Sequence, residues 1–414
     1  MKGNYMRRIS SILIAVVVFL LLGIKSNAQD SIVVFGQPDL TSNQVGHSAT
    51  GMNFPLGISV DGDGGFYVAD RNNHRVLYFS NDGDTTADRV YGQHGNFDSY
   101  TANFDGIGGS GGGPSADNLS MPTVVTMAPD GGIYITDREN HRLLYFAPDG
   151  DTTADRIYGQ FGNYNVNPPN NNTRGGYGLP SADNIGVYSL GVAADASGVY
   201  VSGSSSNRVL FFADDGDTTA DRVYGQSDDF TQDDINNDGS GLPGSPSATN
   251  FNFPRGLALD STGGLYVADR ENNRVLYFAN DGDTTADRVY GQFGDLTANL
   301  DNNDGSGGSG VVSADSLSHP KGIVVAPDGG IYIADSVNSR ILYYAPEGDT
   351  TAEWVFGQAG DFGVGVHNND GSGGSGGPSG DNLVEPQGVG LGPDGRLYIA
   401  DTGNNRVLVV AGHP

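Results

Sequence analysis

The stretch from Gly256 to Gln292, GLALDSTGGLYVADRENNRVLYFANDGDTTADRVYGQ, recurs along the chain and limits its fold more than any other feature. Its four short apolar runs are separated by turns rich in Gly, Asn and Asp: Gly256–Leu259, Leu265–Asp269, Arg274–Ala279 and Ala286–Gln292. Runs of this length, rich in Val, Leu, Tyr and Phe, are too short for helices and are typical of strands. We therefore predict that each copy is a four-stranded antiparallel meander.

Six copies of the central phrase follow one another: Phe66–Phe79, Ile133–Phe146, Val199–Phe212, Leu265–Phe278, Ile331–Tyr344 and Leu397–Val410. The fourth run of five copies ends in aromatic-Gly-Gln, with a spacing of 66 or 67 residues, at Gln93, Gln160, Gln226, Gln292 and Gln358. A fixed period of this size indicates a repeat architecture, and four strands per repeat indicate a propeller blade. The fold class predicted is all-β, a six-bladed β-propeller.

The last copy lacks a fourth strand, because its third run ends at Val410 and the chain ends at Pro414. The missing strand is found at the other end, where residues 31–37, SIVVFGQ, carry the same aromatic-Gly-Gln ending. We predict that this strand completes the last blade and closes the ring, which removes exposed strand edges. The propeller then spans 31–414, with repeat cores at about 54–93, 121–160, 187–226, 253–292, 319–358 and 385–410 plus 31–37.

At these residues the sequence resembles the NHL-repeat family. The signature is Pro-x-Gly before the first strand, Tyr-Val-Ala-Asp at the second and Asn-x-Arg before the third, and it is met in five of the six copies. The resemblance covers essentially all of 31–414 and implies the propeller fold. It does not fix an activity, since NHL propellers include protein-binding and RNA-binding modules, sensor domains and a few lyases.

The N-terminal residues predict export. Lys2, Arg7 and Arg8 precede an apolar run, Ile12–Ile24, and the small residues around Ala28. This order is typical of a secretory signal peptide, residues 1–28, and the apolar run is shorter than the ~20 residues that span a bilayer. We expect cleavage near Ala28, no membrane insertion afterwards, and a bacterial protein secreted to the periplasm or the cell exterior.

The absence of cysteine and the excess of acidic residues limit the metals and binding partners that the protein can have. The chain has no cysteine, which excludes disulfides and thiolate metal sites. Residues 1–28 hold four basic and no acidic side chains, so the remainder has 17 basic and 49 acidic side chains and a net charge of −32. Because phosphate binding needs a positive field, this balance argues against nucleic acid and anionic membranes as partners. We expect a monomer.

An aspartate at the end of the second strand recurs five residues before an arginine that opens the third. We predict structural pairs that brace the turn between these strands: Asp70–Arg75, Asp137–Arg142, Asp269–Arg274, Asp335–Arg340 and Asp401–Arg406.

Long inserts join each fourth strand to the next first strand: 38–53, 94–121, 161–188, 227–253, 293–319 and 359–385. Their composition resembles that of linkers, but a Ser-Ala-Asp-Asn-Leu phrase near Ser115 recurs in later inserts, so we predict ordered loops. Strand alternation puts them on the same face as the turns between second and third strands. We predict that they form a collar on this face, called the collar face below, and that the binding site lies there.

Blade three departs from the repeat, with Ser189 in place of the proline and Gly203 in place of the aspartate. The preceding insert supplies Tyr164, Arg174 and Tyr177. Aromatic side chains beside polar ones suit contacts with a sugar or peptide, so these five residues form the predicted ligand site. The alternative is drift in one copy.

The sequence contains candidates for two kinds of metal site. Asp234, Asn236 and Asp238 match the start of a calcium loop, although Ser245 stands where the closing glutamate would be and the alternative is a simple turn. For zinc, histidines would have to converge from separate blades: His47, His94, His319 and His367 lie in or beside inserts, whereas His74 and His141 share one repeat position and are interpreted as turn residues. Calcium is the cofactor that the Asp234, Asn236 and Asp238 pattern suggests.

Two functions from different classes follow. The first is a secreted, non-catalytic scaffold that binds an extracellular protein, peptide or glycan through the collar face. The alternative is a metal-dependent lyase or lactone hydrolase, which a histidine or carboxylate cluster at the ring axis would favour.

Overall fold

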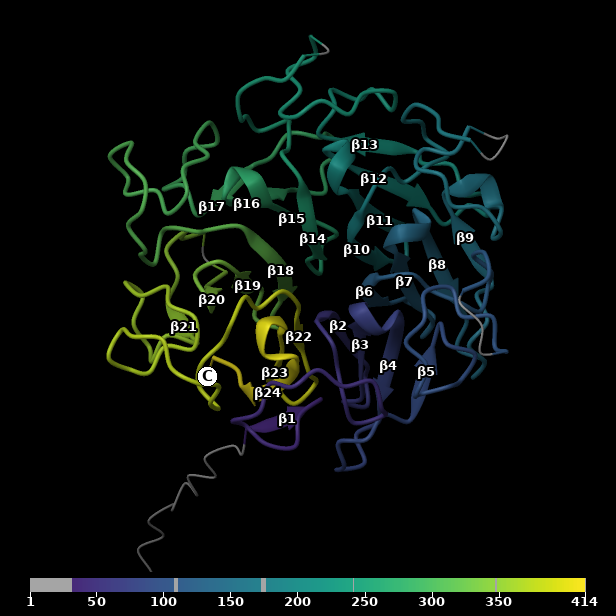
Figure 1. Cartoon of the computed structure of the whole chain (residues 1–414). Helices are drawn as coiled ribbons and strands as arrows, with labels where there is room; N and C mark the ends of the chain where they lie inside the picture. Colours follow the sequence, from purple (N-terminus) through teal and green to yellow (C-terminus); the bar gives the residue numbers. More distant parts are fainter. Residues whose placement is uncertain (1–31, 108–110, 173–175, 241, 347, 414) are drawn as a thin grey trace, which may run out of the picture. The chain divides into compact units, whose positions relative to one another are not determined.

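The computed structural model describes residues 32–413 except 108–110, 173–175, 241 and 347. These residues form six four-stranded antiparallel sheets arranged as the blades of a ring (Figure 1). The all-β six-bladed propeller predicted from the repeat is confirmed. Among the described residues, no helix has the length and apolar character needed to cross a membrane.

The strands follow the repeat. Blade one is β2 (Pro55–Val60), β3 (Phe66–Asp70), β4 (Arg75–Phe79) and β5 (Arg89–Tyr91); blade two is β6 (Pro122–Met127), β7 (Ile133–Asp137), β8 (Arg142–Phe146) and β9 (Arg156–Tyr158). Blade three is β10 (Ser189–Asp195), β11 (Gly198–Gly203), β12 (Arg208–Ala213) and β13 (Arg222–Tyr224); blade four is β14 (Pro254–Leu259), β15 (Leu265–Asp269), β16 (Arg274–Phe278) and β17 (Arg288–Tyr290). Blade five is β18 (Pro320–Val325), β19 (Ile331–Asp335), β20 (Arg340–Tyr344) and β21 (Trp354–Phe356); blade six is β22 (Val389–Leu391), β23 (Arg396–Asp401), β24 (Arg406–Ala411) and β1 (Val33–Phe35).

Short 3-10 turns lie on the collar face. Five connect second to third strands, and η3 follows β9: η1 (Arg71–Asn73), η2 (Arg138–Asn140), η3 (Gln160–Gly162), η4 (Ser204–Ser206), η5 (Arg270–Asn272) and η6 (Thr402–Asn404). The fourth strands are shorter than predicted. In blade four the strand ends at Tyr290, because Gly291 has a φ of 90° and turns the chain away from the sheet.

The ring closes as predicted. The N-terminal strand β1 pairs antiparallel with β24, with Val33 opposite Val409 and Phe35 opposite Val407, and so completes the sheet of β22 and β23. Gln37 then bonds across the junction, since its Nε2 donates to the Asn405 carbonyl at 2.8 Å. The two ends of the ring therefore lie side by side in Figure 1, purple against yellow.

The core lies between blades. Each of six apolar clusters joins neighbouring sheets, and in one of them Tyr67 of blade one packs with Leu144 and Phe146 of blade two. All five residues of β3 are buried, because both faces of a blade are covered. This explains why the second and third strands read as nearly continuous apolar runs.

The glycine of Pro-x-Gly is required by close approach at the ring axis. A Cβ on Gly256 would lie 1.9 Å from the Lys321 carbonyl oxygen, and one on Gly388 would lie 2.0 Å from that of Leu56. Real Cβ atoms do not come so close to backbone, so blades four and six need a glycine here, whereas blade two has Val124 at this position.

The residue before the repeat proline, or before Ser189 in blade three, has a positive φ although its side chain is bulky: Phe54, Met121, Tyr188, Phe253, His319 and Glu385. Such residues are strained and persist only where their surroundings fix them. A contact with the previous blade does so: the Phe253 amide donates to Asn207 Oδ1 at 2.8 Å, and the His319 amide to Asn273 Oδ1 at 3.0 Å. Asn207 and Asn273 themselves end 3-10 turns in the left-handed region.

We expect Gly256→Ala to lower the free energy of unfolding by on the order of 3 kcal/mol, because the methyl group overlaps the Lys321 carbonyl. Urea unfolding followed by circular dichroism measures this. Gly62→Ala, with no atom within 4 Å of its added Cβ, is the matched control and should stay within about 0.5 kcal/mol of wild type. Equal midpoints for the two variants would contradict the steric account.

Candidate functional site

The collar is held by buried ion pairs. In every predicted Asp–Arg pair the Arg Nε lies 2.7–2.8 Å from the carboxylate, and both side chains are fully buried. In blade one, Arg75 Nη2 also donates to the carbonyls of Ser48 and Gly51 in the preceding insert, each at 2.8 Å, and Nη1 donates to the Phe97 carbonyl in the following insert. One guanidinium thus fixes two inserts, which explains how segments so rich in polar residues become ordered.

Blade three lacks this carboxylate. Arg208 Nε has no partner among the described residues, although Nη2 donates to the carbonyls of Ser181 and Asn184 at 3.1 and 2.9 Å. Burial lowers the pKa of Arg208 to about 10. A Cβ on Gly203 would lie 2.7 Å from the Ile185 carbonyl oxygen. The insert before blade three therefore follows a path that leaves no room for the aspartate found at this position in the other blades.

The structure brings together two of the five predicted ligand residues. Ser189 and Gly203 are direct partners at one end of the β10–β11 pair, and both are buried. Tyr164 is half-buried against the cluster between blades one and two, whereas Tyr177 is 79% exposed in its insert. Arg174 lies outside the described residues. The ligand site of blade three stays a prediction.

At the predicted calcium loop, two of the three side chains already have protein partners. The Asn236 amide exchanges hydrogen bonds with Asn272, at 2.7 and 3.2 Å, and Asp238 Oδ1 accepts from the Ser240 amide at 2.9 Å. Asp234 contributes its carbonyl to Gln226 Nε2 at 2.9 Å. Calcium binding there stays a prediction.

The histidines are placed separately. His74 and His141 end η1 and η2 in the left-handed region, as turn residues. Among the described residues, no group of three or more His, Cys, Asp or Glu side chains is placed to hold a metal ion. His141 is 8% exposed, and its Nδ1 has no partner within the part of the chain described.

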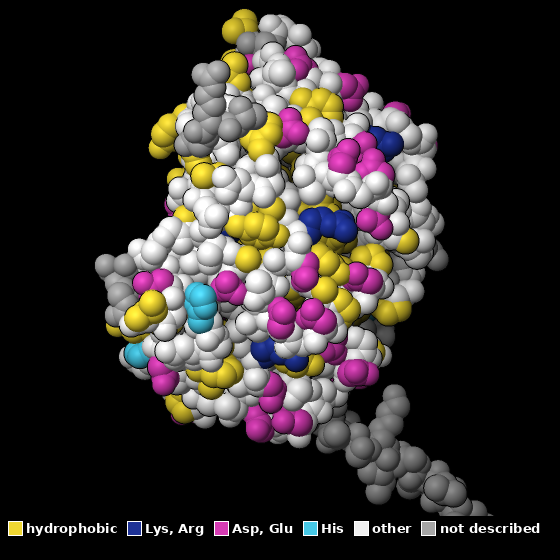
Figure 2. Space-filling model, turned by 90° about the vertical axis from the view of Figure 1, so that its right-hand side faces the viewer, with side chains coloured by type: hydrophobic (Ala, Val, Ile, Leu, Met, Phe, Trp, Pro, Cys, Tyr) yellow, Lys and Arg dark blue, Asp and Glu magenta, His cyan; other side chains and the backbone are white. Residues whose placement is uncertain are grey.

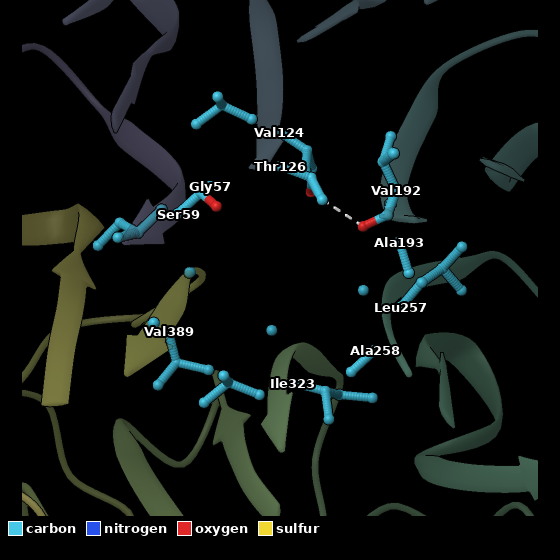
Figure 3. A pocket seen from close by; sticks show the side chains of 18 of the residues that line it. Gly57, Ser59, Val124, Thr126, Val192, Ala193, Leu257, Ala258, Ile323 and Val389 are labelled. Atoms are coloured by element: carbon cyan, nitrogen blue, oxygen red, sulfur yellow. Dashed lines mark hydrogen bonds between the residues drawn. The ribbon is translucent and has the colours of Figure 1, made fainter. Parts of the chain in front are cut away.

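A cavity of about 320 Å³ lies on the ring axis, lined by the first strands of all six blades. Small apolar side chains, among them Val192, Leu257 and Ile323, surround its open centre (Figure 3). Hydroxyls contribute as well, since Thr126 Oγ1 donates to the Val192 carbonyl at 3.0 Å. A volume of this size is at the lower end of small-ligand pockets.

At the collar end the cavity is lined by the residue that follows the Pro-x-Gly proline or its equivalent. We call these six residues the axial mouth: Leu56, Thr123, Leu190, Arg255, Lys321 and Gln387. Arg255 Nη1 donates to Gln387 Oε1 at 3.1 Å. Lys321 is 9% exposed, and no described residue lies within hydrogen-bond distance of its ammonium group. Burial, followed by repulsion from Arg255, lowers the pKa of Lys321 to about 7.

Three arginines stand around the axial mouth. Each opens a 3-10 turn and lies over the ring of a left-handed residue: Arg71 on Phe54 at 5.4 Å, Arg138 on Tyr188 at 4.0 Å and Arg270 on Phe253 at 5.6 Å. Burial lowers the pKa of Arg255 to about 9, and repulsion from these three arginines adds to the effect. Glu139 and Glu271 are paired with Arg138 and Arg270, so they neutralise the outer cations first.

The opposite end of the axis is acidic. A second cavity, of about 490 Å³, shares Val60 and Leu259 with the first and is lined by Asp61 and Asp260 of the first-to-second-strand hairpins. We call this side the hairpin face. The outer surface carries the excess of acid: on the side shown in Figure 2, acidic side chains are spread among a few basic ones. The axial mouth is therefore a local cationic region in a chain of net charge −28.

Reading the sequence by local pattern missed this site, since its residues lie one per blade. The signal is present when the six copies are aligned: the position after the proline reads Leu, Thr, Leu, Arg, Lys, Gln, and only three adjacent copies are long and polar.

Five segments match the NHL repeat: residues 52–79, 119–146, 251–278, 317–344 and 383–410. The chain is also 30% identical over 170 residues to Protein SUPPRESSOR OF QUENCHING 1, chloroplastic, of Arabidopsis thaliana. That match covers 40% of this chain and only 14% of the length of the curated relative.

Two solved structures align with most of this chain. A protein of unknown function from Bacteroides thetaiotaomicron aligns with a TM-score of 0.52 and 17% identity, over 92% of this chain and 75% of that one. Virginiamycin B lyase from Staphylococcus aureus aligns with a TM-score of 0.45 and 14% identity, over 91% and 97%. The first likeness shows a common fold alone, and the second is too distant to indicate a shared activity.

Replacing Gly203 of blade three by the aspartate found in the other blades should destabilise the protein. Gly203→Asp places a Cβ against the Ile185 carbonyl, so we expect the free energy of unfolding to fall by about 1–3 kcal/mol. Asp269→Gly, which leaves the buried Arg274 unpaired in blade four, should cost about 3–5 kcal/mol. Urea unfolding measures both. A stabilised Gly203→Asp would show that the missing carboxylate, and not the insert path, distinguishes blade three.

Replacing His141 by Asn should reduce acid sensitivity. Burial lowers the pKa of His141 to about 4, whereas an unfolded histidine titrates near 6.5, so protons favour the unfolded chain as the pH falls between these values. We expect His141→Asn to retain about 2–3 kcal/mol more stability than wild type at pH 4.5, relative to pH 7.5. Asn occupies the same position in three other blades, at 207, 273 and 405.

The control for this measurement is His367→Asn, since His367 is exposed in an insert. It should leave the pH dependence of the unfolding free energy unchanged. If the two variants behaved alike, burial of His141 would not be the cause of the acid sensitivity.

Proposed function

Because the chain is an NHL-repeat β-propeller protein, we propose that it is an exported, non-catalytic binding protein, and that a protein, peptide or glycan docks on its collar face with one group in the axial mouth. The observation that carries this proposal is Lys321, a residue only 9% exposed that lines the axial cavity and whose ammonium group has no hydrogen-bond or ion-pair partner among the described residues. A buried unpaired charge costs stability, and proteins keep such costs mainly where function needs them.

Other features support the same face. The collar is ordered by buried arginines, so its loops are a fixed surface and not tethers. Loops held on a rigid scaffold commonly carry binding sites. Export is supported by the signal-like residues 1–28, and the acidic surface suits an extracellular setting.

The lyase or lactone hydrolase alternative calls for a histidine or carboxylate cluster at the axis. The described residues of the axial mouth instead offer an arginine, a lysine, an amide and uncharged side chains. No specific observation favours the enzyme.

An array of immobilised oligosaccharides and peptides, probed with the full chain, tests the proposal. We expect at least one array member to bind, and a variant carrying Arg255→Gln and Lys321→Gln to bind it at least 10-fold more weakly. Arg396→Gln, which removes an arginine at the start of β23 on the hairpin face, is the control and should bind like wild type.

The same array tests the ligand site of blade three. Tyr164→Ala and Tyr177→Ala should weaken binding if the ligand extends over that insert. Loss of binding in these variants alone, with the axial mouth variant unaffected, would move the site to blade three. A chain that binds no array member would overturn the proposed function.

A further inference from the structure

We infer that the axial mouth recognises an organic anion, whose carboxylate or phosphate lies between Lys321 and Arg255 and whose apolar part enters the axial cavity. This inference rests on the proposed function and specifies the group that the binding site accepts. Lys321 and Arg255 indicate the anionic group, and the apolar cavity behind them indicates the rest of the ligand.

Lys321 is not needed by the ring. Leu56 and Leu190 occupy the same position in other blades, and beyond residue 25 the chain contains no other lysine. A largely buried lysine at a position where leucine suffices costs stability and adds nothing to the packing of the ring. A bound anion would provide the missing counter-charge and hydrogen-bond acceptor.

Arg255 is incompletely paired. Among the described residues its guanidinium makes one hydrogen bond, from Nη1 to Gln387, and the other donors are left for a ligand. The planar guanidinium binds carboxylate or phosphate through two parallel bonds. Arg255 and Lys321 come from adjacent first strands, β14 and β18, and line the same cavity. Together they form a two-point anion site.

The glutamates near the axial mouth do not neutralise Lys321 and Arg255. Glu271 is shared between Arg270 and His319, whose Nε2 lies 3.5 Å from it, and Glu139 pairs with Arg138 at 2.8 Å. Glu385 also acts on Lys321 electrostatically. Five cations, counting Arg71, therefore meet three carboxylates around the mouth. Within the part of the chain described, both innermost cations lack a salt bridge, as does Arg71, whereas Arg138 and Arg270 are paired.

The cavity behind the pair selects the rest of the ligand. Its walls are largely aliphatic, including Val192, Leu257 and Ile323, and its far end is acidic at Asp61 and Asp260. An anionic head is thus attracted at the collar end and repelled at the hairpin end. A short hydrocarbon tail fills the space between better than a second charged or strongly hydrated group.

Titration provides an independent readout. The pKa of Lys321 is lowered to about 7 by burial and by Arg255 and Arg270, while Glu385 and Glu271 oppose the shift. An anion that binds the protonated lysine better must raise this pKa, and by linkage its own affinity must fall as the pH rises through 7.

Hexanoate and its neutral analogue hexanamide are the matched probes. Isothermal titration with the full chain should show hexanoate binding at least 10-fold more tightly than hexanamide, and more tightly at pH 6 than at pH 8. Lys321→Met and Arg255→Gln should each weaken hexanoate at least 10-fold, whereas Arg396→Gln should not. Equal binding of the two probes, or full binding by Lys321→Met, would overturn the inference.

A nuclear magnetic resonance experiment tests whether the anion acts on Lys321 itself. With ε-13C-lysine, the full chain gives signals only from lysines 2, 25 and 321, and the one missing from Lys321→Met is assigned to Lys321. We expect hexanoate to raise the pKa of this signal, and a titration curve that hexanoate leaves unchanged would overturn the inference. Inorganic phosphate binding as tightly as hexanoate would refute the role of the apolar cavity.

The outcomes separate the two proposals. If array ligands bind and depend on the axial mouth while hexanoate does not bind, the binding function stands and the anion inference fails. If hexanoate binds as expected but no array member does, the anion site stands and the macromolecular function fails.

Discussion

The buried arginine of each blade is the interaction on which the collar depends. Its guanidinium bonds to carbonyls of the insert before it and the insert after it, and in five blades a buried aspartate neutralises it. Removing one partner of such a pair costs about 3–5 kcal/mol, far more than an exposed ion pair would contribute. Inserts with few apolar residues cannot fold by burial, so their order comes from this polar network. The collar face is rigid for the same reason.

At the axis, residues that recur in the blades serve the fold, whereas residues found in one blade alone are candidates for function. Glycines that admit a neighbour's backbone and left-handed residues before the first strands recur around the ring, so their strain belongs to the fold. Lys321 and Arg255 do not recur, and the ring closes equally well around Leu56 and Leu190. Asymmetry within a repeat is therefore a sharper indication of function here than any residue that all blades share.

The strands and the closure of the ring could be predicted from the sequence, because both are encoded locally. Alternation, turn residues and the unpaired ending of residues 31–37 suffice. The axial mouth could not be found in this way, since Arg255, Lys321 and Gln387 lie 66 residues apart and meet only when the ring closes. Blade three shows the same limit: the missing aspartate at Gly203 is visible in the sequence, but the Ile185 carbonyl that would clash with it is not.

Net charge and local charge act at different ranges. A chain of net charge −28 repels a polyanion, because successive phosphates would lie over acidic surface while few could reach the mouth. A small anion escapes most of this repulsion, since charges farther than the Debye length of about 8 Å are screened at physiological salt. Inside the mouth the low dielectric strengthens the attraction of Lys321 and Arg255, and salt screens it little. The acidic surface and the cationic mouth thus favour the same ligand, one with a single charged group on an otherwise apolar body.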